Sequence, residues 1–380
     1  MRVLFSSSPG LGHLFPMIPL AWALRTGGHD VLVASTGDVV ERAAQAGLPA
    51  VEAAPGLDMM KFFGTTVREN ERFGDFASIH ELFVEDPRRA MELVARVFAA
   101  LGDRLTEGML AAAQGWRPDL VVFEQMDSAG PFIAAKLGIP AVQHNFGAAR
   151  GTDELALYAK YTDAYDRHGV TRPTEADAII DIATEGLGTP QIGWPMRYVA
   201  YNAGGVLPGW LLAKRERPRV CVTLGTAVGL MSGVGALGQI VEAAKEIDAE
   251  FIFALGDSDV AELGELPENV RLVEWIPLNA LLEHCDAIVH HGGSGSTFTS
   301  LAAGVPQLLL PHSADQFDNA TLVRDAGIGL WLEDTTVDAS HLTKLLEDKE
   351  IRAACERLRA ENAARPLPSE LVSKLVALAS

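Results

Sequence analysis

The sequence predicts two α/β domains, each built around its own doubly wound parallel sheet. Short apolar runs that end in small or turn-forming residues alternate with segments of helical periodicity along most of the chain. Between the two domains the alternation lapses within residues 194–219, where Gly204, Gly205, Pro208 and Gly209 lie close together, and then restarts. A length of 380 residues suits two such domains. Because ligands bind beyond the carboxyl ends of parallel strands, we expect the two domains to face each other across a cleft.

The first domain, which we place at residues 1–205, opens with a β-α-β-α-β pattern. Its first expected elements are strands over 2–7, 29–35 and 48–54 and helices over 14–28 and 38–47. A loop-rich insertion over 55–90 interrupts this rhythm. The expected elements after it are a helix over 87–116, a strand over 118–125, a helix over 127–138 and a strand over 139–145. Residues 146–180 are polar and indicate helix, so we expect them to cover a site.

A linker over 206–217 leads into the second domain, at residues 218–365, and a final helix follows over 366–380. The expected strands of the second domain cover 219–226, 249–256, 269–275, 286–293, 305–311 and 328–333. The expected helices cover 234–247, 278–285, 294–304 and 315–327. This order again predicts a doubly wound sheet.

Composition excludes several classes of protein. A net charge of −19 argues against a nucleic-acid backbone as the main ligand, because such binding needs a clustered basic surface. An acidic protein can still bind a small anion at a helix N-terminus. No apolar run reaches the ~18 residues of a membrane span, and the apolar start is too short for a signal peptide. We expect a cytoplasmic protein with no stable membrane insertion.

The three cysteines, Cys221, Cys285 and Cys355, lie far apart in the sequence. Their spacing fits neither a disulfide framework nor a zinc site. This cysteine usage indicates a reducing compartment.

The densest polar segment is HHGGSGST, residues 290–297, which joins a buried strand to the next helix. Free N–H groups and the helix dipole make such an N-terminus a site for an anion, and glycines let a diphosphate approach the backbone. The alternative is an ordinary N-cap, which needs far fewer such residues. No Lys precedes the Ser or Thr, so the segment is not a P-loop. The candidate anion-binding residues are His291, Gly292, Gly293, Ser294, Gly295, Ser296 and Thr297.

Three further segments follow strands of the same domain. Asp315 and Gln316 come after the strand QLLLP and can bind a polyhydroxylated ligand, or Asp315 can cap the next helix. Gly225 and Thr226 end the first strand and can contact the same phosphates, or form a simple turn. Trp275 lies at a strand end, where it can stack on a nucleobase or pack in the core.

Together these segments resemble the nucleotide-sugar site of the family 1 glycosyltransferases with the GT-B fold, and most closely the actinobacterial type that makes antibiotics. The resemblance covers nearly the whole chain, and the block HHGGSGST…AGVPQLLLP…DQFDNA is its specific part. It implies two Rossmann-like domains, the first binding the acceptor and the second the nucleotide sugar, with the final helix packed back on the first. It also implies that His291 and Ser294–Thr297 bind the diphosphate, Trp275 faces the base, and Asp315 and Gln316 hold the sugar.

The same resemblance gives a role to His13, which follows the first strand and its glycine-rich turn. It implies that His13 is the general base that deprotonates the acceptor hydroxyl. A neutral imidazole, with an ordinary pKa of about 6.5, suits this work, and a carboxylate should hold its other nitrogen, as in a catalytic triad. Glu124 occupies the position where the family has Asp, and Asp127 is the second candidate partner. The alternative for His13 is a structural residue at a helix N-terminus.

The resemblance further implies direct displacement with inversion at the anomeric carbon, with a thymidine diphosphate deoxysugar as donor and no cofactor. Asp257-Ser258-Asp259 has the spacing that holds a cation in a different glycosyltransferase fold, but short motifs recur by chance and we expect no metal site. The insertion rich in Phe and Met indicates a large apolar aglycone such as a polyketide, although a surface loop could share this composition. Candidate acceptor contacts are Phe15, Met60 and Phe63.

Two other functions stay open at this point. An auxiliary nucleotide-binding subunit of the same fold would not catalyse, and should lack the base or the phosphate block, both of which are present here. A nucleotide-sugar epimerase would need acid and base carboxylates around the sugar and no acceptor. The sequence is compatible with a homodimer but does not determine the oligomeric state.

Overall fold

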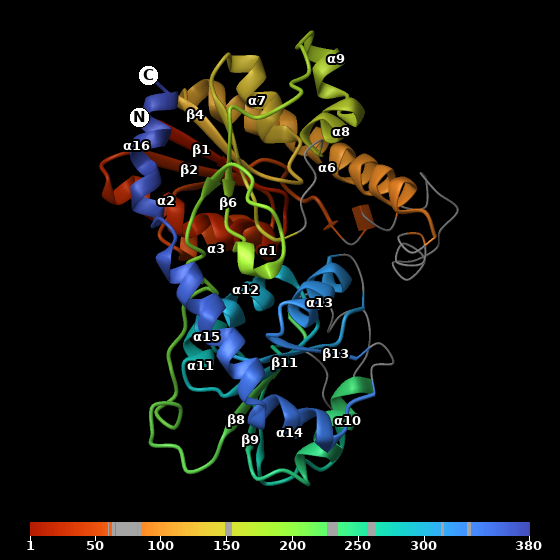
Figure 1. Cartoon of the computed structure of the whole chain (residues 1–380). Helices are drawn as coiled ribbons and strands as arrows, with labels where there is room; N and C mark the ends of the chain where they lie inside the picture. The colour runs from red at the N-terminus through yellow and green to blue at the C-terminus, as the bar shows by residue number, and fades with distance from the viewer. Residues whose placement is uncertain are drawn as a thin grey trace. The chain divides into compact units, whose positions relative to one another are not determined.

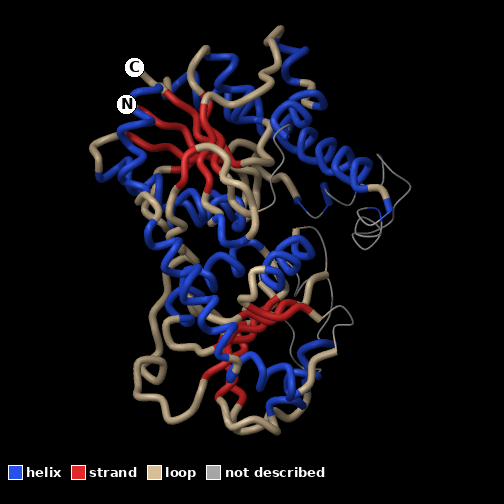
Figure 2. The backbone as a smooth tube through the Cα atoms, in the orientation of Figure 1, coloured by secondary structure: helices blue, strands red, loops and turns tan. Residues whose placement is uncertain are grey.

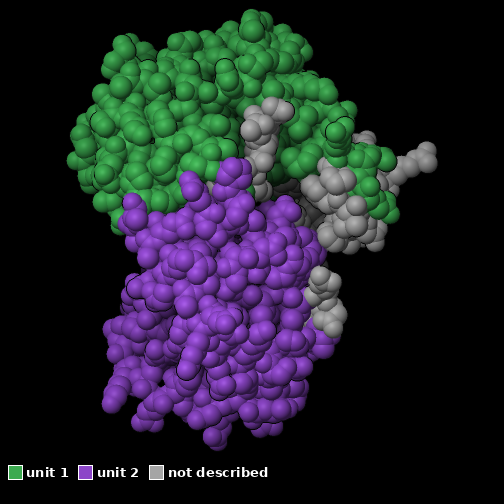
Figure 3. Space-filling model, viewed as in Figure 1, with its two compact units in different colours: residues 1–182, 191–197, 365–380 green, residues 183–190, 198–364 purple. Residues whose placement is uncertain are grey.

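The structure, a computed structural model, describes residues 1–59, 61, 62, 65, 82, 85–148, 154–225, 235–256, 263–312, 315–332 and 336–380. Among the residues singled out above, Met60, Phe63, Thr226 and the triplet 257–259 lie outside the described residues. The chain forms two compact units, shown in separate colours in Figure 3. Unit 1 comprises Met1–Ile182, Gln191–Arg197 and Arg365–Ser380, and unit 2 comprises Ala183–Pro190 and Tyr198–Ala364.

Unit 1 is built on a seven-stranded parallel sheet with the order β3-β2-β1-β4-β5-β6-β7 (Figures 1 and 2). Its strands are β1 (Arg2–Ser6), β2 (Asp30–Ser35), β3 (Ala50–Glu52), β4 (Leu120–Glu124), β5 (Ala141–His144), β6 (Ala178–Asp181) and β7 (Trp194–Pro195). Val3, Leu4 and Phe5 of β1 are fully buried, because helices cover both faces of a parallel sheet. The connections change direction between β1 and β4, the position where doubly wound sheets bind ligands.

The first helical segment of unit 1 departs from the expected pattern. The helices of this unit are α1 (Leu11–Leu14), η1 (Phe15–Met17), α2 (Ile18–Thr26), α3 (Asp38–Gln45), α6 (Pro87–Trp116), α7 (Ala129–Leu137), α8 (Glu154–Tyr161), α9 (Ala164–His168) and α16 (Pro368–Leu378). The single helix expected over 14–28 is wrong, since α1 precedes it and η1 interrupts it. Pro16 and Pro19 lack an N–H donor, so the turn that contains them cannot form the full set of α-helical hydrogen bonds.

The end of the segment 146–180, expected to be helical throughout, forms the strand β6 instead. Its residues Ile179 and Ile180 are β-branched and favour a strand. Ile180 is fully buried, and β6 pairs with β5 and β7. Tertiary pairing with β5 therefore decides the conformation of this short run.

Unit 2 is built on a six-stranded parallel sheet with the order β10-β9-β8-β11-β12-β13. Its strands are β8 (Arg219–Thr223), β9 (Glu250–Ala254), β10 (Val270–Val273), β11 (Ala287–His290), β12 (Gln307–Leu309) and β13 (Gly329–Trp331). Its helices are η2 (Glu185–Leu187), α10 (Gly235–Ala244), α11 (Leu278–Leu282), α12 (Ser294–Ala303), α13 (Gln316–Asp325), α14 (Ala339–Glu347) and α15 (Lys349–Ala364). The prediction of two doubly wound parallel sheets is thus confirmed.

Helix α16 belongs to unit 1, although 167 residues of unit 2 precede it in one stretch of the chain. It packs against α2, where the side chain of Val372 lies close to Gly27. None of the described helices combines the length and the apolar character that a membrane span requires.

Candidate active site

The first candidate cluster lies in unit 1, where β1 and β4 end side by side. Glu124 is the last residue of β4, and the turn after β1 leads into the short helix α1, which carries His13. His13 Nδ1 and Glu124 Oε1 are 3.2 Å apart, with Glu124 fully buried and 20% of the His13 side chain exposed. The structure therefore brings together the two residues expected to form the base and its carboxylate partner.

Two backbone N–H groups also bind the carboxylate of Glu124. Ser8 N donates to Oε1 at 3.2 Å and Met126 N donates to Oε2 at 2.7 Å. Burial by itself would raise the pKa of Glu124, but the charge and hydrogen bond of His13 and the two N–H donors outweigh it and lower the pKa below its ordinary value. Because the ionised carboxylate only accepts hydrogen bonds, it favours a proton on Nδ1 of His13, and in the neutral form of the ring Nε2 is then the nitrogen with the lone pair.

Aromatic rings and a glycine hold the imidazole of His13 in place. Its ring centroid lies 4.5 Å from that of Phe146 and 5.9 Å from that of Phe98. A Cβ atom at Gly10 would come within 2.7 Å of His13 Cδ2, so no larger residue fits there unless the ring moves. The expected acceptor residue Phe15 lies in η1, partly buried and two positions beyond His13.

Asp127, the second candidate partner of His13, directs its carboxylate to helix α7. Its Oδ1 accepts a hydrogen bond from Ala129 N at 2.9 Å and its Oδ2 accepts one from Gly130 N at 3.1 Å. Burial and the negative charge of Glu124 raise the pKa of Asp127 to about 7. Asp127 thus caps a helix, and Glu124 is the carboxylate that His13 contacts.

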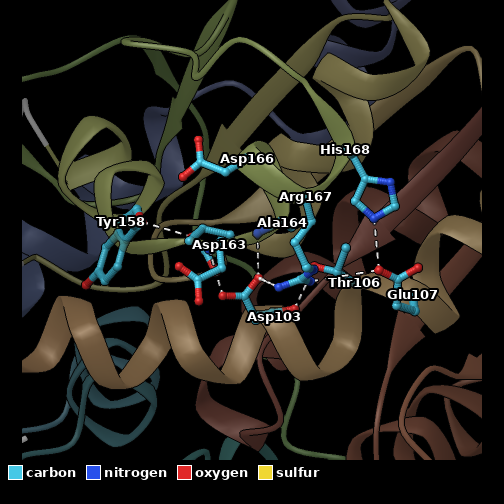
Figure 4. Close-up of polar contacts among 12 residues, drawn as sticks. Asp103, Thr106, Glu107, Tyr158, Asp163, Ala164, Asp166, Arg167 and His168 are labelled. Carbon is cyan, nitrogen blue, oxygen red and sulfur yellow. Dashed lines mark hydrogen bonds and ion pairs between the residues drawn. The ribbon is translucent and has the colours of Figure 1, made fainter.

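Helix α6, which carries Phe98, also anchors the segment that contains α8 and α9 (Figure 4). Asp103 of α6 accepts hydrogen bonds from Asp163 N and Ala164 N, both at 2.8 Å. The guanidinium of Arg167 lies 3.2 Å from the same carboxylate. Helix α6 therefore both contacts the His13 ring and caps α9. The helical pattern of the sequence did not reveal either contact.

The second candidate cluster lies in unit 2, where β11 turns into α12. The ring of His291 packs between two glycines, since a Cβ atom at Gly225 or Gly293 would come within 2.3 Å or 2.4 Å of the imidazole. Burial, with the neighbouring His290 and His312, lowers the pKa of His291 to about 3, so the ring is neutral. Its Nδ1 is buried and hydrogen bonds to no residue that the structure describes.

The first turn of α12 is held by side chains on both sides. Ser294 Oγ donates to Asp315 Oδ2 at 2.6 Å, and Thr297 Oγ1 donates to the carbonyl of Gly293 at 3.1 Å. Asn319 Nδ2 donates to Ser294 Oγ at 3.1 Å and to Asp315 Oδ2 at 3.2 Å. The backbone N–H groups of such a first turn have no acceptor within the helix and can bind an anion.

The sequence pattern did not single out Asn319 as a site residue, although it lies within the segment DQFDNA. It follows Asp315 by four residues, so the two lie on one face of α13, and this spacing is the signal that would have found it. The amide of Gln316 accepts a hydrogen bond from His312 N at 2.8 Å. Trp275 is 40% exposed, so it is available for stacking on a ligand.

Gly292, Gly295 and Ser296 complete the expected anion-binding segment. Gly292 has a φ of +90°, in the region that favours glycine, and Gly295 and Ser296 are partly exposed in the first turn of α12. Among the described residues, no group of three or more His, Cys, Asp or Glu side chains could hold a metal ion.

Comparisons with known proteins agree over the whole chain. The family described as erythromycin biosynthesis protein CIII-like matches in both of its domains, the N-terminal one over residues 22–225 and the C-terminal one over 238–378. The elloramycin glycosyltransferase ElmGT of Streptomyces olivaceus is 40% identical over an alignment of 380 positions that covers 99% of this chain and 97% of the relative.

Two solved structures show the same fold. The glycosyltransferase SnogD from Streptomyces nogalater superposes with a TM-score of 0.85 at 40% identity, covering 100% of this chain and 99% of that one. The glycosyltransferase SsfS6 from Streptomyces sp. SF2575, complexed with thymidine diphosphate, superposes with a TM-score of 0.84 at 30% identity, covering 99% of both chains. The fold is the GT-B fold of two Rossmann-like domains that the sequence predicted.

Proposed function

Since the chain belongs to the erythromycin biosynthesis protein CIII-like family and is a natural-product glycosyltransferase, we propose that it moves a deoxysugar from thymidine diphosphate to a polyketide-type aglycone. The thymidine nucleotide is supported by the relative SsfS6, which was solved with thymidine diphosphate. In this proposal residues 1–205 bind the acceptor and residues 218–365 bind the donor.

The observation that carries the mechanism is the contact of 3.2 Å between His13 Nδ1 and Glu124 Oε1. An acceptor hydroxyl is a poor nucleophile until a base takes its proton. Nε2 of His13 takes that proton as the oxygen attacks the anomeric carbon. The ionised Glu124 stabilises the imidazolium that forms, as the carboxylate does in a catalytic triad.

The leaving diphosphate is bound at the N-terminus of α12. The neutral His291 donates one hydrogen bond, and the N–H groups of the first turn donate others. The buried Nδ1 of His291, which has no partner among the described residues, supports this role. Displacement in one step inverts the anomeric carbon, and the charge that develops on the leaving group is stabilised by these donors without a metal.

Asp315 and Gln316 hold the sugar, and Trp275 stacks on the base. In the structure Asp315 is bonded to Ser294 and Gln316 to the backbone of His312, so their oxygens are held in place at the start of α13. The 40% exposure of Trp275 is consistent with a stacking surface.

The test replaces His13 with Ala and follows transfer from a thymidine diphosphate deoxysugar to aglycones of a polyketide panel by mass spectrometry. We expect kcat to fall by about 100-fold or more, while thymidine diphosphate binds with unchanged Kd by calorimetry. His168→Ala is the matched control, because His168 contacts Glu107 at 2.9 Å, outside the cluster, and it should keep wild-type turnover. A His13→Ala enzyme within a few-fold of wild type would remove His13 as the base.

A further inference from the structure

We propose that His290 is a positioning residue for the donor diphosphate, acting through the peptide N–H of Gly292 to hold the turn that carries His291. The inference rests on the proposed function, because it assigns the diphosphate to this turn. His290 is the last residue of β11 and is fully buried. It has no access to a ligand of its own, so any effect on binding must pass through the groups that it contacts.

Two hydrogen bonds determine the tautomer of His290. Gly292 N donates to Nδ1 at 3.0 Å, so Nδ1 carries the lone pair. Nε2 therefore carries the proton and donates to Gln307 Oε1, 2.9 Å away on the neighbouring strand β12. Burial lowers the pKa of His290 to about 4, which keeps the ring neutral and Nδ1 able to accept at neutral pH.

The other side of Gly292 is held as well. Its carbonyl oxygen accepts a hydrogen bond from Asn319 Nδ2 at 2.8 Å. With its φ of +90° and a Cβ position only 3.0 Å from Gln316 O, Gly292 has little freedom to rotate. Its N–H and its carbonyl therefore both have buried side-chain partners, one from β11 and one from α13.

This double attachment determines where the next groups lie. Gly292 separates His291 from Gly293, and the His291 ring fits against Gly293 with no room for a Cβ atom. If the Gly292 N–H loses its acceptor, the peptide can rotate, and His291 and the first N–H groups of α12 move with it. Hydrogen bonds to a diphosphate depend on such alignment, whereas stacking of a nucleobase elsewhere in the site does not.

The experiment compares thymidine diphosphate with thymidine, because only the first carries the phosphates. His290→Leu removes both hydrogen bonds. We expect this substitution to weaken the affinity for thymidine diphosphate about tenfold, as measured by calorimetry. The affinity for thymidine, measured by ligand-observed NMR, should not change. The matched control is His144→Leu, which removes another fully buried histidine at the end of a strand, in unit 1. It should leave both affinities unchanged.

A second pair of variants covers the case in which His290→Leu does not fold. The side chain of Asn can place an oxygen near the position of Nδ1, so His290→Asn keeps an acceptor for Gly292 N. The longer side chain of Gln reaches toward Gln307 instead. We expect His290→Asn to bind thymidine diphosphate within about twofold of wild type, and His290→Gln to bind it as weakly as His290→Leu.

Two results would overturn the inference. One is that His290→Leu binds thymidine diphosphate as tightly as wild type does, or that His290→Asn and His290→Gln bind it equally tightly. The other is a proportional loss of diphosphate and nucleoside affinity, which would indicate general disruption. A wild-type protein that binds neither thymidine nor uridine diphosphate would instead refute the proposed function on which the inference rests.

Discussion

At the scale of single residues, Glu124 and Asp127 show how two neighbouring carboxylates acquire different roles from what they face. Glu124 faces His13 and the N–H groups of Ser8 and Met126, which lower its pKa. Asp127 faces the N–H groups at the start of α7, and burial beside Glu124 raises its pKa to about 7. Environments that push two carboxyl pKa values apart are typical of acid-base sites.

We predict that Glu124→Gln lowers kcat by about 10- to 100-fold, because a neutral amide stabilises the His13 imidazolium less than a carboxylate does. Asp127→Asn should change kcat less than threefold. Relative to wild type it should be less stable at about pH 5 than at about pH 7.5, because the amide cannot gain the stabilisation that protonation of Asp127 supplies as the pH falls. Steady-state kinetics and thermal melts of both variants check this. A larger kcat loss in Asp127→Asn would mean that Asp127 is the partner of His13.

The sequence could predict these carboxylates only by counting along β4, and it left both as candidates. It could not predict that Ser8 and Met126 donate to Glu124, because backbone donors leave no mark in the sequence. The close packing of Gly225 and Gly293 against the His291 ring could not be predicted either. Gly225 precedes His291 by 66 positions, and the sequence does not show that the two meet in the folded unit. Residue types predict which chemistry is present, whereas orientation depends on tertiary contacts.

At the scale of elements, the alternation of apolar runs and helical segments predicted both sheets, because strands buried on both faces leave a strong signal. The predictions that were wrong, for the first helix and for β6, have local causes. Prolines 16 and 19 divide the first helix, and a four-residue strand, β6, is too short to stand out within a polar segment. Helix α6 was predicted with its observed bounds, but its cap on α9 joins residues 60 positions apart.

The attachment of α9 to α6 gives a prediction at this scale. Asp103→Ala removes the acceptor of two N–H groups and the partner of Arg167, which should cost about 1 kcal/mol locally. Amide exchange in residues 163–168 should then rise about fivefold, with little change in the melting temperature. The matched control, Asp166→Ala, removes an exposed ion pair with Arg172 and should leave exchange nearly unchanged. Equal exchange in both variants would show that Asp103 does not anchor α9.

At the scale of the whole molecule, the buried titratable groups are distributed unequally between the units. Unit 2 contains His290 and His291, whose pKa values burial lowers to about 4 and about 3. Unit 1 contains His144, whose pKa burial lowers to about 4, and Asp127, whose pKa is raised to about 7 by burial and by the charge of Glu124. The histidines and the carboxyl respond to pH in opposite directions.

For each histidine the folded pKa lies below the unfolded value of about 6.5, so the unfolded chain binds more protons between these values. Each histidine therefore makes its full contribution to the free energy of unfolding above about pH 6.5. This contribution is lost as the pH falls, by about 2 kcal/mol per histidine at about pH 5. For Asp127 the folded pKa lies above the unfolded value of about 3.9, so its contribution grows as the pH falls from about 7 to about 4. In unit 1 this gain offsets the loss from His144.

Acidification from about pH 7.5 to about pH 5 should therefore destabilise unit 2 more than unit 1. Hydrogen exchange with mass spectrometry, corrected for the intrinsic rate at each pH, separates the units because each gives its own peptides. Protection should fall further in β8, β11 and β12 than in β1, β4 and β5. In Asp127→Asn the strands of unit 1 should lose as much protection on acidification as those of unit 2. Equal losses in the two sheets of the wild type would contradict the argument.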